Sequence, residues 1–108
     1  MALHLPEPVA RYFAADKRDD EAIAKCFTEN AIVKDEGHTD TGLNEIKRRK
    51  AETSTKYVYT SEPLASEAKD GKTVVTSRLT GNFAGSPVNL RFFFRLEGNK
   101  IAFLEIIP

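Results

Sequence analysis

The sequence predicts an α+β fold in which three N-terminal helices pack on the concave face of a curved antiparallel sheet. Apolar residues recur at helical spacing in the first half of the chain, and in the second half they alternate with polar residues at the period of strands. Helices followed by hairpin-linked strands are typical of an α+β domain. A curved sheet of this kind forms a cone, and the mouth of the cone is a natural ligand pocket.

Length and composition restrict the class of protein. The 108 residues suffice for one domain, and 30% charged with 41% apolar residues is the balance of an ordinary soluble globular protein. The formal net charge of zero argues against a nucleic acid or a membrane as the partner. Cys26 is the single cysteine, which excludes an internal disulfide, and the N-terminus does not resemble a signal peptide, so we expect a cytoplasmic location.

Three helices and one strand are predicted in the first half of the chain. The helices span residues 7–19, 19–27 and 41–53, and a strand spans 28–35. Proline near residue 7 suits a first helical turn, where a missing N–H costs nothing. The side chains expected to face inward from the helices are Val9, Tyr12, Phe13, Ile23, Cys26, Phe27, Leu43 and Ile46.

Four further strands are predicted after residue 56. Asp70-Gly71 and Gly98-Asn99 are typical of tight hairpin turns, and Gly85-Ser86-Pro87 indicates a looser one. These turns separate runs that alternate apolar and polar residues. The predicted strands are 56–68, 72–83, 88–97 and 100–107.

The last two predicted strands are apolar on both faces. A sheet with one face in water should not carry aromatic side chains on its wet side. A second copy of the chain would cover them and give a homodimer, with outward arginines pairing with Glu105. The alternative is that these are scattered surface hydrophobics, which are common. The residues expected on this outer face are Arg78, Arg91, Phe93, Arg95, Ile101, Phe103, Glu105 and Ile107.

Three short stretches carry a resemblance to a known family. The first helix contains "ARYFAA", the segment "CFTENAIVKDEG" leads into a strand that ends in an acid, and "TGLNEI" opens the third helix. In this order and spacing they resemble the SnoaL-like polyketide cyclase and ketosteroid isomerase branch of the nuclear transport factor 2-like superfamily. The resemblance spans essentially the whole chain, but this superfold hosts enzymes, binding domains and scaffolds.

The resemblance implies a site at the end of the first strand. Asp35 matches the catalytic base of ketosteroid isomerase, and Tyr12 matches its oxyanion donor. Phe92 stands where that enzyme has a second, protonated acid, and it cannot donate a hydrogen bond. On the third helix, Arg49 or Lys50 is the next inward position, where a cation would suit an acidic or enolate-bearing ligand.

Each of these residues also has a structural interpretation. Asp35 could be an exposed strand-end acid, and Tyr12 a core residue with a satisfied hydroxyl. His38 is either an acid–base partner or a solvated loop residue, and the stem of Arg49 could lie on the core with its charge in water. Glu36 and Asp40 are expected to be solvated charges of a loop that rims the pocket.

The pocket wall is expected to be strongly apolar, which suits a small hydrophobic ligand. Gly81, in mid-strand, either permits a bend or makes room for that ligand. We expect no cofactor, and no metal either, because one cysteine and two distant histidines do not make a ligand set. The expected lining residues are Phe13, Arg49, Leu79, Gly81, Phe83, Phe92, Phe94, Leu104 and Ile106.

The leading hypothesis is an isomerase, cyclase or lyase that transfers a proton on a small hydrophobic carbonyl compound. Asp35 would be the base and Tyr12 the oxyanion donor, with His38 as a further catalytic candidate. The alternative is a non-catalytic, dimeric small-molecule binding or interaction domain. The missing second acid favours this alternative.

Overall fold

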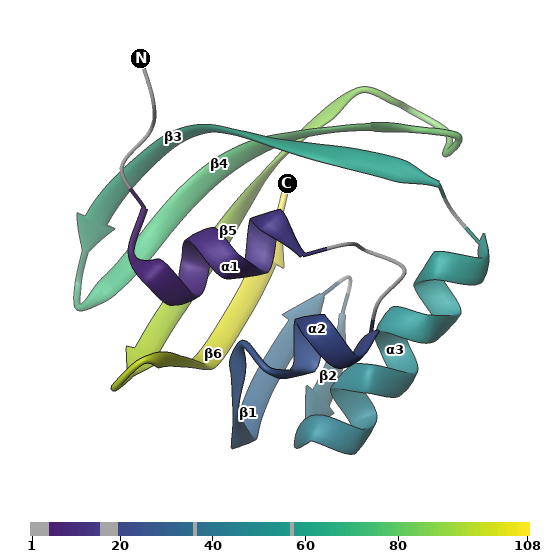
Figure 1. Cartoon of the computed structure of the whole chain (residues 1–108). Helices are drawn as coiled ribbons and strands as arrows, with labels where there is room; N and C mark the ends of the chain where they lie inside the picture. The colour runs from purple at the N-terminus through teal and green to yellow at the C-terminus, as the bar shows by residue number, and fades with distance from the viewer. Residues whose placement is uncertain (1–4, 16–19, 36, 57) are drawn as a thin grey trace.

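The computed structural model describes residues 5–15, 20–35, 37–56 and 58–108 (Figure 1). Within these residues the chain forms helices first and a curved sheet later, which confirms the predicted α+β class. The elements in chain order are α1 Glu7–Ala14, α2 Asp20–Ala24, β1 Phe27–Asp35, β2 His38–Thr41, α3 Leu43–Lys56, β3 Tyr59–Lys69, β4 Lys72–Gly81, β5 Val88–Glu97 and β6 Lys100–Ile107.

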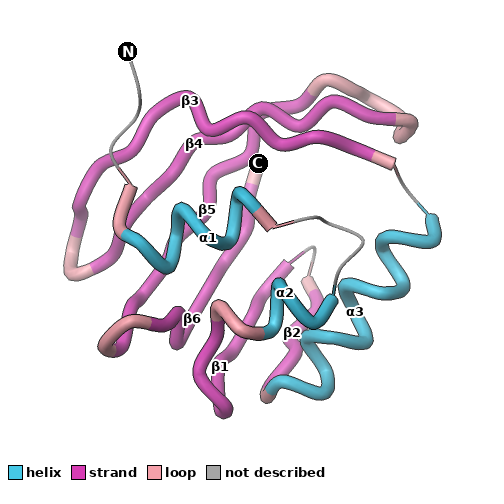
Figure 2. The backbone as a smooth tube through the Cα atoms, in the orientation of Figure 1, coloured by secondary structure: helices cyan, strands magenta, loops and turns pink. Residues whose placement is uncertain are grey.

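One sheet contains all the described strands, in the order β2-β1-β6-β5-β4-β3 (Figure 2). Neighbouring strands are antiparallel except β1 and β6, which pair in parallel, whereas the sequence predicts an antiparallel sheet throughout. The reason is topological: β6 returns to β1 only after β2, α3, β3, β4 and β5, and so long a connection permits a parallel neighbour. This pairing sets the end of β1 beside the end of β6.

The helices cover the concave side of the sheet (Figure 1). Helix α1 crosses it between β3 and β6, while α3 lies against β1 and β2 with α2 beside it. The second predicted helix is shorter than expected because residue 27 already begins β1, and residues 16–19 of the first lie outside the described residues. Of the helices that the structure describes, none is long and apolar enough to cross a membrane.

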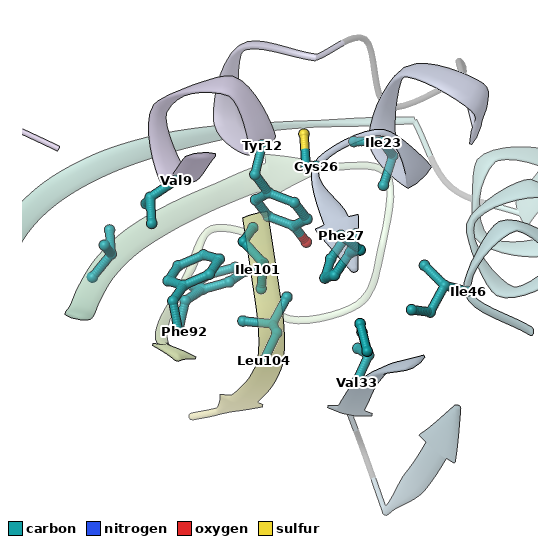
Figure 3. Close-up of a cluster of buried hydrophobic side chains, with 13 residues drawn as sticks. Val9, Tyr12, Ile23, Cys26, Phe27, Val33, Ile46, Phe92, Ile101 and Leu104 are labelled. Carbon is teal, nitrogen blue, oxygen red and sulfur yellow. The ribbon is translucent and has the colours of Figure 1, made fainter. Parts of the chain in front are cut away.

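The core lies between α1 and the concave face of the sheet (Figure 3). Its centre is the ring of Tyr12, which is 1% exposed. Phe27 and Phe94 meet this ring edge-on, with centroids 5.9 and 5.6 Å away. Each such edge-to-face contact stabilises the fold by roughly 0.5–1.5 kcal/mol, in addition to the contribution of the apolar surface that the rings bury. The aromatic cluster therefore fixes α1 on the sheet.

The predicted tight turn between β3 and β4 is confirmed. Asp70 and Gly71 both have positive φ, 52° and 76°, which is the backbone of a two-residue hairpin turn. The segment after Asp35 differs from its prediction as a loop, because residues 38–41 pair with β1 as a short strand. Asp35 lies opposite His38 in this hairpin.

The prediction that Ile101 faces outward is wrong. Its side chain is fully buried in the core cluster. The β5–β6 register shifts between Arg95 and Leu96, and the β1–β6 register shifts nearby, so strict alternation fails at the start of β6. A bulge of this kind moves the residues beyond it to the other face.

Replacing Ile101 by Ala is expected to lower the free energy of unfolding by about 2–5 kcal/mol, because it leaves a cavity in the core. Ile107→Ala is the matched control, since the sequence alone places both residues on one face. Ile107 is only partly buried, and its substitution should cost less than about 1 kcal/mol. Urea unfolding measures the loss of stability in each variant, provided that the m-values are equal. Equal losses for the two variants would contradict the conclusion that Ile101 lies in the core.

Candidate functional site

A small cavity opens at the mouth of the cone, with a volume of about 70 Å³. It receives residues from α1, α3 and five of the strands, so no single segment builds it. Its wall combines apolar side chains with acidic, basic and hydroxyl groups. The lining residues are Tyr12, Val33, Asp35, Arg49, Lys50, Tyr59, Ser61, Leu79, Leu90, Phe92 and Ile106.

Asp35 reaches this cavity because of strand alternation. Ala31 and Val33 of β1 are buried on the concave side, and Asp35 is the next residue on that face. In register it lies beside Ile106 of β6, which also lines the cavity. Asp35 is partly buried, so its carboxyl group borders the cavity rather than standing in bulk water. Tyr12 lines the same cavity from α1.

The hydroxyl of Tyr12 accepts a hydrogen bond from Lys50 Nζ at 3.0 Å. Lys50 follows the buried Ile46 by one turn of α3, which aims its side chain into the cone. Burial works to lower the pKa of Lys50, but the neighbouring phenols of Tyr12 and Tyr59, the hydrogen bond and the Asp35 carboxyl outweigh it and raise the pKa. Lys50 is therefore an ammonium ion at neutral pH.

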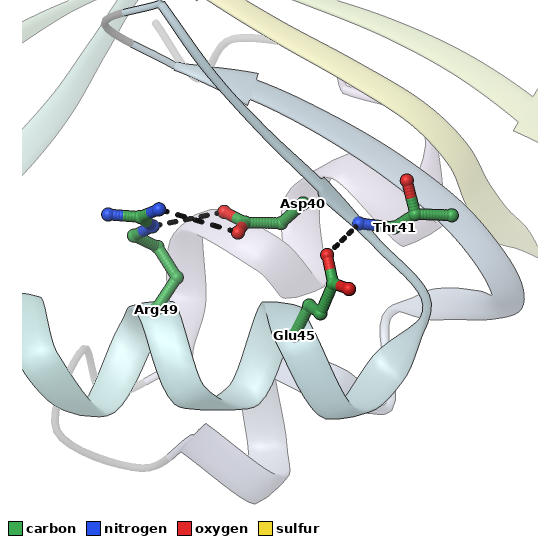
Figure 4. A network of polar contacts seen from close by, with 4 residues as sticks. All are labelled: Asp40, Thr41, Glu45 and Arg49. Carbon is green, nitrogen blue, oxygen red and sulfur yellow. Dashed lines mark hydrogen bonds and ion pairs between the residues drawn. The ribbon is translucent and has the colours of Figure 1, made fainter.

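Arg49 also lines the cavity and is held by Asp40 of β2 (Figure 4). Its Nε and Nη2 donate to the two carboxylate oxygens of Asp40, at 3.1 and 3.5 Å. The hydrogen bond to Asp40 and the charge of that carboxylate raise the pKa of Arg49. The prediction that Asp40 is a solvated loop charge is wrong: it is 8% exposed, because β2 turns it toward α3. Glu36 lies outside the described residues.

Tyr59 and Ser61 of β3 are lining residues that sequence reasoning missed. Burial raises the pKa of the Tyr59 phenol, against the opposing charge of Lys50. Ser61 shares a 2.7 Å hydrogen bond with the buried Ser77 of β4. The period-two spacing of residues 59 and 61 was the available signal, since both positions share one face of the strand. Lys50 was not missed: the sequence predicts Arg49 or Lys50 at the next inward position of the third helix, and both line the cavity.

The other predicted lining residues divide into three groups. Arg49, Leu79, Phe92 and Ile106 line the cavity. Phe94 and Leu104 are fully buried beneath it, and Phe13 packs against the same core. Gly81 and Phe83 are not among its lining residues. A Cβ at position 81 would come within 2.4 Å of the Val58 carbonyl oxygen, so Gly81 admits the neighbouring backbone rather than a ligand.

His38 borders a second, larger groove of about 480 Å³ at the end of β1 and β6. Its side chain is exposed. Asp35, Leu90 and Ile106 line both this groove and the small cavity, so they form the wall between the two. Within the described part of the chain, no group of three or more His, Cys, Asp and Glu side chains gathers to hold a metal ion.

The structure is similar to several solved proteins. A candidate polyketide cyclase from Sinorhizobium meliloti has 37% sequence identity and a TM-score of 0.89, with 94% of each chain covered. The chain belongs to the SnoaL-like branch of the nuclear transport factor 2-like superfamily. No protein-family model matches the sequence, and no curated protein matches it.

Two more distant structures share the SnoaL-like fold. A candidate SnoaL-like polyketide cyclase from Jannaschia sp. has 17% identity, a TM-score of 0.75 and coverage of 94% of this chain and 82% of its own. A hypothetical protein from Catenulispora acidiphila with a ketosteroid isomerase-like fold, in complex with trimethylamine, has 19% identity, a TM-score of 0.84 and coverage of 97% and 87%. At these identities the likeness concerns the fold alone.

Replacing Asp40 by Asn is expected to lower the free energy of unfolding by about 1.5–3 kcal/mol, the range for hydrogen bonds to charged groups. The matched control is Glu7→Gln, which breaks the exposed ion pair between Glu7 and Arg11 on α1. An exposed pair of this spacing contributes about 0.5 kcal/mol or less. Thermal and urea unfolding compare the two variants, and equal effects would show that the Asp40–Arg49 pair does not stabilise the fold.

Proposed function

We propose that this SnoaL-like protein catalyses proton transfer on a small hydrophobic carbonyl compound, as an isomerase, cyclase or lyase. The observation that carries the proposal is that Asp35 and Tyr12 line one cavity from opposite elements, β1 and α1. A carboxylate and a phenol around one small space are the two groups that such a reaction needs.

The chemistry follows from the two groups. The Asp35 carboxylate takes a proton from the carbon next to the carbonyl group of the substrate. The electron pair of that C–H bond forms a C=C bond, and the π pair of the carbonyl group moves onto its oxygen to give an enolate. Tyr12 donates a hydrogen bond to this oxygen as its negative charge develops. Asp35 then returns the proton to another carbon of the same molecule. Alternatively, the enolate carbon attacks a second carbonyl carbon and closes a ring, and the alkoxide formed there takes the proton back from Asp35.

The size of the cavity restricts the substrate. A volume of about 70 Å³ is far below the several hundred Å³ of a site for a drug-sized ligand. It admits the reacting end of a molecule, while Leu79, Leu90 and Ile106 offer apolar contacts at its rim. The similarity to a candidate polyketide cyclase supports a carbonyl substrate.

Asp35→Asn is expected to abolish proton exchange between substrate and solvent. Incubation with a panel of small cyclic ketones and aldehydes in D₂O, followed by NMR, measures deuterium uptake at the carbon next to the carbonyl group. Because a positioned base contributes at least about 100-fold, the variant should exchange at least that much more slowly than the wild type. Its affinity for a bound ketone should persist.

Glu97→Gln is the control for that experiment, because Glu97 is an exposed carboxylate at the far end of β5. It should leave the exchange rate unchanged. Equal rates for the wild type and the Asp35→Asn variant would contradict the proposal, as would the absence of enzyme-dependent exchange across the panel. The protein would then be better described as a binding domain.

A non-catalytic binding role is the second candidate, and one observation favours it. The position that the family resemblance assigns to a second acid holds Phe92, whose ring borders the cavity without a donor. In this role the same cavity holds a small hydrophobic ligand, and Asp35→Asn changes affinity alone.

We also propose that the outer face of the sheet forms a homodimer interface. Phe93 and Phe103 are partly exposed there, and the cations of Arg91 and Lys72 lie 5.9 and 5.3 Å from their ring centroids. In register, Phe93 lies beside Glu105 and Arg95 beside Phe103, so opposite charges flank the aromatic rings. Arg78 and Arg91 are exposed and extend this face across β4 and β5.

The double substitution Phe93→Glu with Phe103→Glu is expected to give a monomer, because it places charges at the centre of the interface. Light scattering coupled to size-exclusion chromatography measures the mass. Leu64→Glu is the matched control, since Leu64 of β3 is 42% exposed outside this patch, and it should leave a dimer. A wild-type protein that is monomeric at micromolar concentration would overturn the proposal.

A further inference from the structure

Lys50 is the group in the cavity that the proposed proton transfer leaves unexplained. Its ammonium donates to the Tyr12 hydroxyl at 3.0 Å and lies 5.1 Å from the centroid of the same ring. A lysine rarely lies at the edge of an apolar core unless it has a partner or a function. Here it stands beside the phenol that would act on the substrate oxygen.

We propose that Lys50 and Tyr12 together form an oxyanion-binding site. The ligand of the cavity then carries an oxygen that is neutral on entry and becomes negatively charged during the reaction. This inference rests on the proposed proton transfer and names its substrate class, which is an enolisable carbonyl compound.

The direction of the hydrogen bond supports this role. An ammonium group can only donate, so the Tyr12 oxygen is the acceptor in this bond. Donation from a cation draws electron density from the phenol and makes it a stronger donor. Lys50 thus acts on a ligand oxygen both through Tyr12 and by its own charge.

The balance of charge in the cavity supports it as well. The ionisable lining groups are Tyr12 from α1, Asp35 from β1, Arg49 and Lys50 from α3, and Tyr59 from β3. Asp40 compensates Arg49 by their ion pair, which leaves Lys50 facing the charge of Asp35.

Proton transfer changes only the location of the negative charge. When Asp35 takes a proton from the substrate, the carboxylate becomes neutral and the substrate oxygen becomes anionic. Lys50 donates to Tyr12, which would hold the substrate oxygen, and it interacts with the charge of Asp35, so a cation faces the negative charge both before and after the transfer. In a partly buried site, a fixed cation at this point stabilises an anion more than it does in solution.

Lys50 could take the place of a group that ketosteroid isomerase, by the resemblance, has elsewhere in its site. The resemblance places a second oxyanion acid at the position of Phe92 on β5, and this side chain cannot donate. Helix α3 supplies a cation at the hydroxyl of Tyr12 instead. This exchange explains how the cavity could stabilise an oxyanion although its strand wall is apolar.

The test uses 4-nitrophenol and nitrobenzene as probes, since they are similar in shape and only the first can become an oxyanion. It is made in the Asp35→Asn variant, whose neutral residue 35 matches the state after proton transfer. We expect 4-nitrophenolate to bind at least about 10-fold more tightly than nitrobenzene, the effect of one charge-assisted hydrogen bond. Absorbance should show the bound probe ionising about one pH unit lower than in solution.

Adding Lys50→Met to this variant should remove the preference and the shift. Lys47→Met is the matched control, because Lys47 lies one turn away on α3 and pairs with Glu21 outside the cavity. It should leave both effects intact, and Lys50→Arg should retain part of them because it keeps the charge. Circular dichroism and thermal melting establish that each variant is folded.

Two results would overturn the inference. One is a phenolate preference that persists in the folded Lys50→Met protein. The other is the absence of any preference in the Asp35→Asn protein, which decides the matter even if the Lys50 variant does not fold. If the wild type catalyses no deuterium exchange but the Asp35→Asn variant still prefers 4-nitrophenolate to nitrobenzene, the proposed proton transfer is refuted and the oxyanion site is not. Exchange without the preference would refute the oxyanion site alone.

Discussion

The burial of Tyr12 is the interaction on which the rest of the structure depends. Its ring joins α1 to the aromatic side chains of β1 and β5, and its hydroxyl meets Lys50 of α3. One side chain therefore connects the helix that closes the cone, the sheet beneath it and the helix at its side. The apolar ring stabilises the core, while the hydroxyl reaches the cavity. In this protein the core and the candidate site are adjoining parts of one cluster.

The position of α3 is the second constraint. Arg49 is tied to Asp40 of β2 by a two-point contact, and Ile46 is buried one turn earlier. The backbone N–H of Thr41 donates to Glu45 at 2.8 Å and closes the start of the helix (Figure 4). These contacts hold α3 in one rotation about its axis, and that rotation brings Lys50 to Tyr12. An ion pair at the edge of the site thus orients a cation inside it.

The two faces of the sheet serve different purposes. The concave face holds the core and the small cavity, whose charges nearly balance. The convex face carries partly exposed aromatic rings between arginines, which is unusual for a surface that meets only water. Asp35, Leu90 and Ile106 line both the small cavity and the larger groove, so the candidate base borders both spaces.

The sequence alone determined the fold class, the four late strands to within a few residues and the tight turn at Asp70. These features follow from local periodicity and turn chemistry, which depend on neighbouring residues only. The family resemblance singled out Asp35 at the end of the first strand, and helical periodicity placed Tyr12 on the inner face of the first helix. Tertiary structure decided what local patterns do not contain. The β-bulge turned Ile101 into the core, and the pairing of β2 buried Asp40 against Arg49. The hydrogen bond between Tyr12 and Lys50 joins residues 38 positions apart, so only the packing of α1 against α3 could bring them together.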